Sequence, residues 1–292
     1  MKTLQEILRD ASDRHVAVGH FNVSDLTALY AIVAAARELN VPVMIGVSEG
    51  EREFMGVREI RALVSAIRDE YDFPIFLNAD HTHSLEKAKE AAEAGFDEII
   101  FDGSKLPFAE NVAQTKRAVE MIKSINPNIV VEGEIGYIGS SSEIVEKVPE
   151  GSGLGGANLT TPEEAKQFIA ATGIDVLAPA VGNMHGLLKS MVSGDVKKRL
   201  DIQRITAIRE ATNIFMTLHG GSGTAGEDFV AAIKAGITIV HVNTEIRIAW
   251  RRGVEAGLAE NPNEVAPYKI LPKAGEEIKK VVLNRLTLFS GK

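Results

Sequence analysis

Residues 73–104 read FPIFLNADHTHSLEKAKEAAEAGFDEIIFDGS and contain one unit of the pattern that decides the fold. An apolar run of strand length at 73–80 is followed by a helical segment and then by a second apolar run at 96–102. Further runs of the same kind lie at 16–23, 41–48, 128–135, 174–182, 213–220 and 237–243. Strands that alternate with helices and are apolar on both faces predict a closed parallel barrel, the (β/α)8 TIM barrel.

The segments between the runs have helical patterns. In the first interval, apolar residues recur at helical spacing at Leu26, Leu29, Ile32, Val33 and Ala36. The segment 161–164, TPEE, has the residues of a helix start, with proline in the first turn. An open doubly wound sheet is the alternative, but no GxGxxG follows the first run and no composition break divides the chain. We therefore expect residues 1–292 to form a single catalytic barrel domain.

Two segments fall outside the barrel pattern. Residues 136–160, GYIGSSSEIVEKVPEGSGLGGANLT, are too long for a simple strand-to-helix connection. They are predicted to form a mobile loop at the active site, with a decorated surface loop as the alternative. Residues 245–292 are predicted to form two additional C-terminal helices, joined around NPNEVAPYKILP.

The composition excludes several classes of protein. The chain carries 40 acidic and 32 basic residues, a net charge of −8, which argues against binding to nucleic acid or to an anionic membrane. It has no cysteine, which excludes disulfides, thiolate metal sites and cysteine nucleophiles. No run of about 18 apolar residues is present, and the N-terminus lacks the apolar core of a signal peptide. A cytoplasmic protein is expected.

Polar residues follow the predicted strands at the end where barrel enzymes place their chemistry. From the first strand to the eighth, these residues are Asn22, Ser48, Asp80, His81, Asp102, Glu132, Glu134, His185, His219, His241, Asn243 and Thr244. Polar groups at the same end of so many strands indicate one functional site rather than unrelated interior residues.

Three of these residues are the histidines His81, His185 and His219. Imidazole together with carboxylate, without thiolate, suits Zn²⁺, Co²⁺, Mn²⁺ or Fe²⁺. Three protein ligands would leave one position open for a substrate oxygen. A hydrogen-bonded interior role is the alternative for any single histidine, and we expect that role for His20 and His83. His15 is expected at the surface.

Glycines adjoin two of the three histidines, in HG at 185–186 and in HGGSG at 219–223. Glycine lets backbone N–H groups face an anion, and barrels hold phosphate with the loops after strands seven and eight. Tight turns are the alternative, and no Walker GxxxxGK[ST] motif occurs. A metal beside a phosphate site suggests carbonyl chemistry on a sugar phosphate, with a carboxylate that moves protons. The rival Schiff-base route lacks a lysine at a strand end, Lys105 being the nearest.

Six segments carry motifs that are specific as a set. They are NADH at 78–81, DGSKLPFAENV at 102–112, EGEIGYIG at 132–139, GNMHG at 182–186, LHGGSG at 218–223 and VNTEIRIAW at 242–250. Together they resemble the class II, metal-dependent fructose-bisphosphate and ketose-bisphosphate aldolase family over nearly the whole chain. The resemblance implies reversible cleavage of a ketose bisphosphate, by default fructose 1,6-bisphosphate, to dihydroxyacetone phosphate and glyceraldehyde 3-phosphate.

The resemblance also implies a role for each candidate residue. Zn²⁺ or another divalent transition metal would be bound by His81, His185 and His219, with Asp102 and Glu134 placed for a second or displaced metal. Asp80 would donate a proton to the aldehyde-derived oxygen. The substrate and its phosphate would contact Asn22, Ser48, Gly186, Gly220, Gly221, Ser222, Asn243 and Thr244. A monovalent cation near the phosphate and a homodimer or homotetramer are also implied.

The chain departs from the family pattern at several places. Asn78 stands where the family has histidine, and His241 stands where it has asparagine. A C-terminal Asp-Pro-Arg is replaced by APYK at 266–269, in which Lys269 could take the place of the arginine. An acid pair expected after EGEIGYIG is absent. Glu143 is predicted to be the enolising base, and the alternatives are Glu146 and then Glu132.

These departures leave other functions open. One is an aldolase of the same mechanism for tagatose bisphosphate or another phosphorylated sugar or sugar acid. Another is a metal-dependent hydrolase or isomerase on the same barrel, since a fold does not determine chemistry. The third is a catalytically weak binding protein. The expected partner is a small-molecule sugar phosphate, with neither nucleic acid nor membrane.

Overall fold

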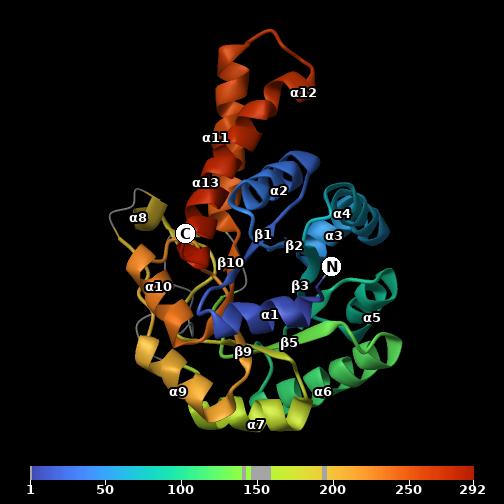
Figure 1. Ribbon diagram of the computed structural model, residues 1–292, viewed down its shortest axis with the longest axis vertical. Helices are drawn as coiled ribbons and strands as arrows, with labels where there is room; N and C mark the ends of the chain where they lie inside the picture. Colours follow the sequence, from blue (N-terminus) through green and yellow to red (C-terminus); the bar gives the residue numbers. More distant parts are fainter. Residues whose placement is uncertain (1, 140–142, 146–158, 193–195) are drawn as a thin grey trace.

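A computed structural model describes residues 2–139, 143–145, 159–192 and 196–292 (Figure 1). Parallel strands close into a barrel in the order β1-β10-β9-β7-β5-β4-β3-β2. They are β1 (Val18–Asn22), β2 (Val43–Val47), β3 (Ile75–Thr82), β4 (Glu98–Phe101), β5 (Val130–Ile135), β7 (Val176–Pro179), β9 (Phe215–Leu218) and β10 (Ile237–Val242). Each strand coincides with one predicted run, and only β3 continues past its run. The predicted (β/α)8 barrel is confirmed.

Helices follow the strands and cover the outer face of the barrel (Figure 1). They are α2 (Leu26–Leu39), α3 (Glu49–Met55), α4 (Val57–Tyr71), α5 (Leu85–Ala94), α6 (Phe108–Ile125), α7 (Pro162–Thr172), α9 (Ile202–Thr212) and α10 (Gly226–Ala235). Outward strand residues such as Phe21 and Ile45 are buried between strands and helices. The predicted start of α7 is confirmed, because Thr161 caps the helix, Pro162 opens it and Glu164 completes a capping box.

Helix α1 (Leu4–Asp13) closes the amino-terminal end of the barrel. It begins at Thr3, which forms a capping box with Glu6. The residues of the barrel floor, which pack together, are Leu4, Ile7, Leu8 and Ala11 of α1 with Val18, Met44, Phe76, Val130, Val176 and Ile239 of the strands. This apolar floor leaves the opposite end of the barrel for polar residues.

The inward side chains become polar above this floor. Residues two apart on a strand face the same side, so the inward positions can be followed along each strand. The next inward residues, all buried, are His20, Asn78, Glu132, Thr217 and His241. The last ones, at the carboxyl ends, are Asn22, Asp80, Glu134, His219 and Asn243. The carboxyl end of the barrel therefore carries two successive layers of polar side chains.

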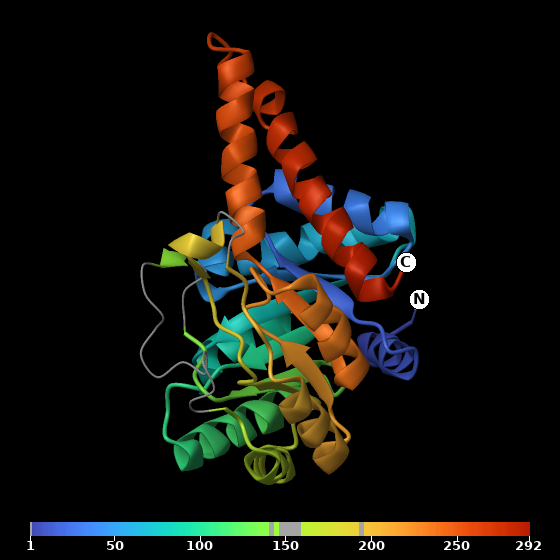
Figure 2. The ribbon, with the colours of Figure 1, turned by 90° about the vertical axis from the view of Figure 1, so that its left-hand side faces the viewer.

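The C-terminal helices extend beyond the barrel as an antiparallel pair (Figure 2). They are α11 (Thr244–Glu260) and α13 (Pro272–Ser290), joined through the short α12 (Pro267–Ile270). A Cβ at Gly253 would lie 2.3 Å from the Cα of Ala274, and a Cβ at Gly257 would lie 2.4 Å from the carbonyl oxygen of Ile270. Glycine is therefore needed where the two helices meet. The two predicted C-terminal helices are confirmed, and α12 is an addition.

The described part of the segment 136–160 contains one short strand. This strand, β6 (Ile144–Val145), pairs in parallel with β8 (Leu187–Leu188), and α8 (Lys189–Val192) follows directly. In Figure 2 these short elements lie on one side of the barrel and α1 lies on the other. Ser140, Ser141, Ser142 and Glu146 lie outside the described residues.

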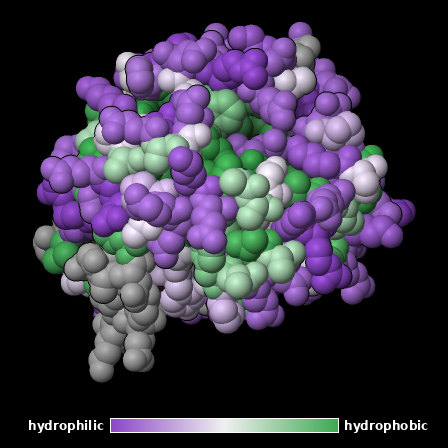
Figure 3. Space-filling view, turned by 90° about the horizontal axis from the view of Figure 1, so that it is seen from below, coloured by the Kyte–Doolittle hydropathy of each residue, from purple (hydrophilic) through white to green (hydrophobic). Residues whose placement is uncertain are grey.

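Apolar side chains are concentrated in the interior. The two largest groups lie between strands and helices and on the barrel floor. The face seen from below is mostly hydrophilic, with apolar side chains gathered near its middle (Figure 3). None of the described helices combines the length and the apolar character needed to cross a membrane.

Candidate active site

The end of β3 is bent so that two neighbouring residues reach the same cavity. The pairing of β3 with β4 shifts register between Ala79 and Thr82, and His81 has a φ of 41°. In a regular strand Asp80 and His81 would face opposite sides. Because of this bulge, both the carboxylate and the imidazole line one cavity at the carboxyl end of the barrel.

A buried arginine, Arg52 of α3, holds this bend. Its guanidinium donates to the carbonyl oxygens of Val47 at 2.6 Å and Asp80 at 3.1 Å, and to the hydroxyl of Thr82 at 3.0 Å. A residue with an uncommon backbone conformation persists only where its surroundings hold it there. Arg52 lies outside every strand-end motif, so sequence reasoning does not single it out.

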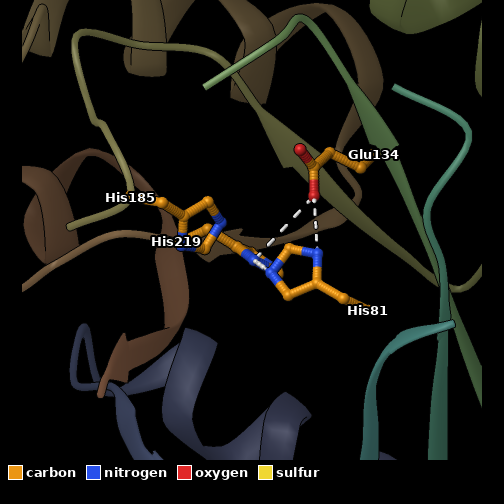
Figure 4. A group of neighbouring side chains, drawn as sticks. All are labelled: His81, Glu134, His185 and His219. Carbon is orange, nitrogen blue, oxygen red and sulfur yellow. Dashed lines mark hydrogen bonds and ion pairs between the residues drawn. The ribbon is translucent and has the colours of Figure 1, made fainter. Parts of the chain in front are cut away.

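Four side chains converge at the carboxyl end of the barrel (Figure 4). One ligand atom from each of His81, Glu134, His185 and His219 lies within 4.8 Å of the others. Nε2 of His81 is 3.2 Å from Nδ1 of His219. Glu134 Oε2 is 3.6 Å from His81 Nδ1 and 3.9 Å from His219 Nδ1. The structure thus brings together the three histidines that sequence reasoning places at one site.

Two carboxylates determine how two of the histidines are turned. Asp102 Oδ2 lies 2.8 Å from Nδ1 of His81, and Glu132 Oε1 lies 2.6 Å from Nε2 of His219. A ring nitrogen that donates to the carboxylate it faces leaves the opposite nitrogen of the same ring for a metal. The other oxygen of Asp102 accepts from the N–H and hydroxyl of Ser104. Asp102 therefore lies beside the four-residue cluster and orients His81.

The geometry of the cluster fits a divalent metal ion. Both carboxylate oxygens of Glu134 and Nε2 of His185 are buried without a hydrogen-bond partner among the described residues. Two nitrogen ligands of a tetrahedral Zn²⁺ lie about 3.3 Å apart. The nitrogens of His81 and His219 are 3.2 Å apart. Burial raises the pKa of Glu134 to about 8, with a further contribution from Asp102, and a bound cation would favour its ionised form.

Asp80 lies next to the four-residue cluster of His81, Glu134, His185 and His219. Its Oδ2 accepts from Asn22 at 2.8 Å, and its Oδ1 is 3.5 Å from Nδ1 of His241 and 3.8 Å from Nε2 of His81. Burial opposes the ionisation of Asp80. The charge of His81 and the nearby imidazole of His241 outweigh burial and hold the pKa of Asp80 well below its usual value. Asp80 is therefore an ionised carboxylate at the wall of the cavity.

Four residues of the barrel interior form a chain of contacts. The ring of His20 stacks on that of His241 with centroids 3.4 Å apart, and His20 Nε2 lies 3.2 Å from Asn78 Oδ1. Asn78 donates in turn to Glu98 at 2.5 Å. Asn78 and His241 are two positions where the chain departs from the family it resembles, one by asparagine for histidine and one by the reverse. The structure brings these two positions together, because His20 contacts both side chains.

A cavity of about 260 Å³ opens beside the four-residue cluster. It is lined by Ser48, Glu49, Gly50, Asp80, His81, His83, Asp102, His185, Asn243 and Arg247. A smaller inner pocket is lined by Asn22, Asp80, His185, Gly186, Gly220, Ser222, His241, Asn243 and Thr244. Asp80, His185 and Asn243 belong to both linings, so the two spaces adjoin each other. His83, expected to be structural, lies at this cavity with a side chain that is 44% exposed.

Gly221 is the predicted phosphate residue that lies outside both linings. Its N–H donates to the carbonyl oxygen of His241 at 3.0 Å. A Cβ at Gly221 would lie 2.7 Å from the same oxygen. Gly221 therefore packs the loop against β10, and its N–H is already engaged within the protein.

Two other predicted residues lie at the edge of the site or away from it. The side chain of Glu143 is exposed, and its carbonyl oxygen accepts from the N–H of Leu187 at 2.9 Å, two residues beyond His185. Lys269 lies on α12, where it pairs with Glu264 at 2.8 Å, and it does not line the cavity. The backbone of Glu143 is thus bonded to the loop that carries His185, whereas Lys269 belongs to the projecting helices.

Arg247 is a cavity residue that sequence reasoning does not single out. It is the only arginine or lysine among the described residues that line the cavity. Its Nη2 lies 2.8 Å from Oε1 of Glu51, and Glu51 also accepts from Asn22 at 2.9 Å. A signal is present in the sequence, because Arg247 follows Thr244 by three residues and lies on the next turn of the same helix.

Known proteins resemble this chain over nearly its whole length. The sequence model of the family described as "Fructose-bisphosphate aldolase class-II" matches residues 2–292. The fructose-bisphosphate aldolase of Geobacillus stearothermophilus is 35% identical over 295 residues, which cover 99% of this chain and 98% of that protein. The fructose-bisphosphate aldolase of Staphylococcus aureus strain Mu50 is 34% identical over 290 residues, which cover 98% of this chain and 96% of that protein.

Solved structures show the same similarity in three dimensions. The crystal structure of the YdjI aldolase from Escherichia coli K12 has a TM-score of 0.81 at 26% identity, covering 98% of this chain and 96% of that chain. The fructose-bisphosphate aldolase of Campylobacter jejuni also has a TM-score of 0.81, at 18% identity, covering 98% of this chain and 94% of that chain. At 18% identity, the similarity to the Campylobacter jejuni structure concerns the fold alone.

We predict that Glu132→Ala weakens Zn²⁺ binding by about 10- to 100-fold, because His219 loses the acceptor that determines its orientation. Zinc affinity is measured on metal-free protein by competition with a chromophoric chelator.

The matched control is Glu98→Ala, which removes another fully buried barrel carboxylate that contacts Asn78 rather than a metal-binding histidine. Its zinc affinity should stay close to that of the parent protein. Equal losses in both variants would indicate a general weakening of the barrel and would contradict the orienting role of Glu132.

Proposed function

Because the chain belongs to the class II fructose-bisphosphate aldolase family, and is therefore an aldolase that acts as a carbon–carbon lyase, we propose that its substrate is fructose 1,6-bisphosphate. Reversible cleavage yields dihydroxyacetone phosphate and glyceraldehyde 3-phosphate. The observation that carries this proposal is the convergence of His81, Glu134, His185 and His219 beside Asp80 at one cavity.

The metal that this family requires is proposed to be Zn²⁺, held by His81, His185 and His219 with Glu134 close by. Imidazoles and a carboxylate without thiolate suit zinc, and three histidines leave a position for the substrate. The ion would polarise the ketose carbonyl and stabilise the negative charge that develops as the carbon–carbon bond breaks. The protein contributes the orientation of the imidazoles through Asp102 and other carboxylates.

The phosphate of the dihydroxyacetone half is proposed to bind in the inner pocket. Thr244 is the first residue of α11, so the start of a long helix faces this pocket and favours an anion. Gly186 and Gly220 have φ values of 76° and 60°, a conformation that glycine adopts easily, and they present backbone without a side chain. The hydroxyl of Ser222 accepts from the N–H of Glu245 at 3.3 Å, which leaves its hydrogen for a phosphate oxygen.

Two carboxylates are proposed to move the protons. In cleavage, Asp80 accepts the proton of the hydroxyl beside the breaking bond, and that oxygen becomes the aldehyde carbonyl. The electron pair of the bond stays on the carbon of the dihydroxyacetone phosphate half, and Glu143 gives this carbon a proton. In synthesis both transfers run in reverse. The position of Glu143 beside Leu187, next to the loop of His185, supports its role.

The second phosphate is proposed to bind Arg247. The aldehyde half would extend from the metal cluster into the larger cavity, whose described lining includes the acidic residues Glu49 and Asp102. A phosphate there needs a cation, and Arg247 is the arginine that this lining offers. Lys269, the candidate suggested by the sequence, lies on α12 and does not line this cavity.

An aldolase of the same mechanism with another phosphorylated sugar is the second candidate. The observation that favours it is His241, which lines the inner pocket at a position where the family has asparagine. A panel of aldehydes condensed with dihydroxyacetone phosphate distinguishes the two candidates. The homodimer or homotetramer implied by the family stays a prediction, as does a cytoplasmic location.

Asp80→Asn and Glu143→Ala are predicted to fail at different steps. Asp80→Asn should lose about 10²- to 10⁴-fold in cleavage while it keeps its metal, because the general acid–base group is gone. Glu143→Ala should slow exchange of the carbon-bound proton of dihydroxyacetone phosphate with solvent by at least about 10²-fold. Cleavage is followed by coupled detection of dihydroxyacetone phosphate, and exchange by proton NMR in D₂O.

The matched control for Glu143→Ala is Glu163→Ala, which removes an exposed glutamate from the first turn of α7. Unchanged exchange in Glu143→Ala would exclude Glu143 and shift the role to Glu146, with Glu132 as the next candidate. Loss of metal from Asp80→Asn would show that Asp80 supports the metal site and not the proton transfer.

Arg247→Ala is predicted to raise the KM for glyceraldehyde 3-phosphate by about 10- to 100-fold in condensation, because charged hydrogen bonds to the phosphate are lost. The KM for unphosphorylated glyceraldehyde should change little. The control is Arg251→Ala, one helical turn further along α11, where the side chain is 79% exposed. An equal change for both aldehydes would exclude Arg247 as the phosphate residue.

A further inference from the structure

Lys198 is a buried lysine that the proposed reaction does not use. It is 1% exposed, and its Nζ lies 2.5 Å from the carbonyl oxygen of Met184, 2.7 Å from that of Gly186 and 3.0 Å from that of Gly220. Lysine is almost never fully buried without a partner. Here the partners are three backbone carbonyl oxygens, which form a carbonyl cage around the ammonium group.

Each of the three peptide groups of the carbonyl cage is held through both its C=O and its N–H. In each of them the carbonyl oxygen accepts from Lys198. The N–H of the same peptide donates to another carbonyl oxygen: His185 to Ile138 at 2.8 Å, Leu187 to Glu143 at 2.9 Å and Gly221 to His241 at 3.0 Å. One of these peptides directly precedes His185, another lies one residue beyond His185, and the third lies one residue beyond His219. Lys198 therefore fixes the backbone beside two proposed metal ligands.

The three contacts require the charged form of Lys198. A neutral amine has two hydrogens and an ammonium has three, so only the ammonium can donate to all three oxygens. Burial lowers the pKa of Lys198 to about 7, and the carboxylate of Glu245 opposes this shift. Hydrogen bonds to three carbonyl oxygens also favour the charged form.

The backbone of Lys198 is fixed as well. Its N–H donates to the carbonyl oxygen of Gly223 at 2.9 Å, and its own carbonyl accepts from the N–H of Ala225 at 3.3 Å. Lys198 and Thr224 form a parallel bridge between these two bonds. The ammonium group therefore reaches the cage from a chain segment that is itself held in place.

Cages of carbonyl oxygens bind K⁺ in other proteins, where they replace the hydration shell of the ion. The family resemblance leads to the expectation of such a monovalent cation near the phosphate. Gly186 and Gly220, whose carbonyl oxygens hold Lys198, both line the inner pocket where the phosphate is proposed to bind. We propose that the ammonium of Lys198 occupies the monovalent-cation site of this protein, so that no free monovalent cation is needed.

A tethered ammonium differs from a free ion in one respect. The occupancy of a free ion depends on its concentration and affinity, whereas Lys198 is always present. The positive charge beside the inner pocket, and the fixed backbone around His185, would therefore not vary with the salt composition. The benefit for phosphate binding rests on the proposed function, but the occupancy of the carbonyl cage by Lys198 does not.

Rubidium anomalous diffraction tests the occupancy directly, because Rb⁺ substitutes for K⁺ and is visible in crystals soaked in rubidium salts. The parent protein, loaded with zinc, should show no Rb⁺ within bonding distance of the three carbonyl oxygens. Lys198→Ala should bind Rb⁺ there, since the oxygens have lost their donor. Rb⁺ in the cage of the parent protein would overturn the proposal, whether or not the protein cleaves fructose 1,6-bisphosphate.

The KM for dihydroxyacetone phosphate in condensation tests the consequence. In the parent enzyme it should be equal in K⁺ and in tetramethylammonium, which is too large for the cage. Lys198→Met, which keeps the length but not the charge, should raise this KM by about 10- to 100-fold. K⁺ should restore part of the loss in Lys198→Ala but not in Lys198→Met, whose side chain still fills the cage. The control is Lys197→Met, at the exposed residue before Lys198, and this variant should keep the KM of the parent enzyme.

A parent enzyme that depends on K⁺, or a folded Lys198→Met with an unchanged KM, would overturn the proposal. Thermal unfolding of the zinc-loaded variants identifies any variant that does not fold. The Rb⁺ diffraction and the comparison of KM in K⁺ and tetramethylammonium use the parent protein and need no variant. A parent protein without aldol activity but with a cage free of Rb⁺ would contradict the proposed function and still support the assignment of Lys198.

Discussion

Nε2 of His81 and Nδ1 of His219 lie 3.2 Å apart, while the opposite nitrogens of these rings are committed to Asp102 and Glu132. Two imidazole lone pairs at this distance repel each other unless a cation lies between them. A proton can supply that charge: burial lowers the pKa of His81, but the neighbouring carboxylates outweigh burial and hold it well above its usual value. A divalent metal also satisfies Glu134, whose oxygens have no other partner among the described residues. The rest of the site is arranged around this requirement for positive charge.

The barrel supports this site by an unusual use of its interior. Most barrels of this type fill the interior with branched apolar side chains. Here the described residues fill it in that way only at the floor, where the strands pack against α1. Buried polar groups are costly unless they are hydrogen-bonded. Thr217 donates to Glu132 and Asn78 donates to Oε2 of Glu98, whereas Oε1 of Glu98 has no partner among the described residues. Two fully buried cations fix the backbone around the site. Arg52 holds the bulge of β3, and Lys198 holds the loops that follow β7 and β9.

The strands and the convergence of His81, His185 and His219 could be predicted from the sequence because their signals are local. An apolar run marks each strand, and a polar residue at its end marks the site. Arg52 and Lys198 could not be predicted in this way, because their main partners are backbone carbonyl groups, which every residue has and which no side-chain motif marks. The departures at Asn78 and His241 are visible in the sequence as two separate changes. Only the closed barrel shows that the two positions are neighbours, because His20 lies within hydrogen-bond distance of Asn78 and stacks on His241.

The presence of one divalent ion between His81 and His219 is tested most directly by anomalous diffraction at the zinc edge on crystals of the zinc-loaded protein. We predict a single zinc peak per chain, with nitrogens of His81, His185 and His219 at about 2.0–2.1 Å, the usual zinc–imidazole distance. A peak at another group of residues, such as His20 and His241, would contradict this arrangement. So would the absence of a peak from a sample that elemental analysis shows to be fully loaded.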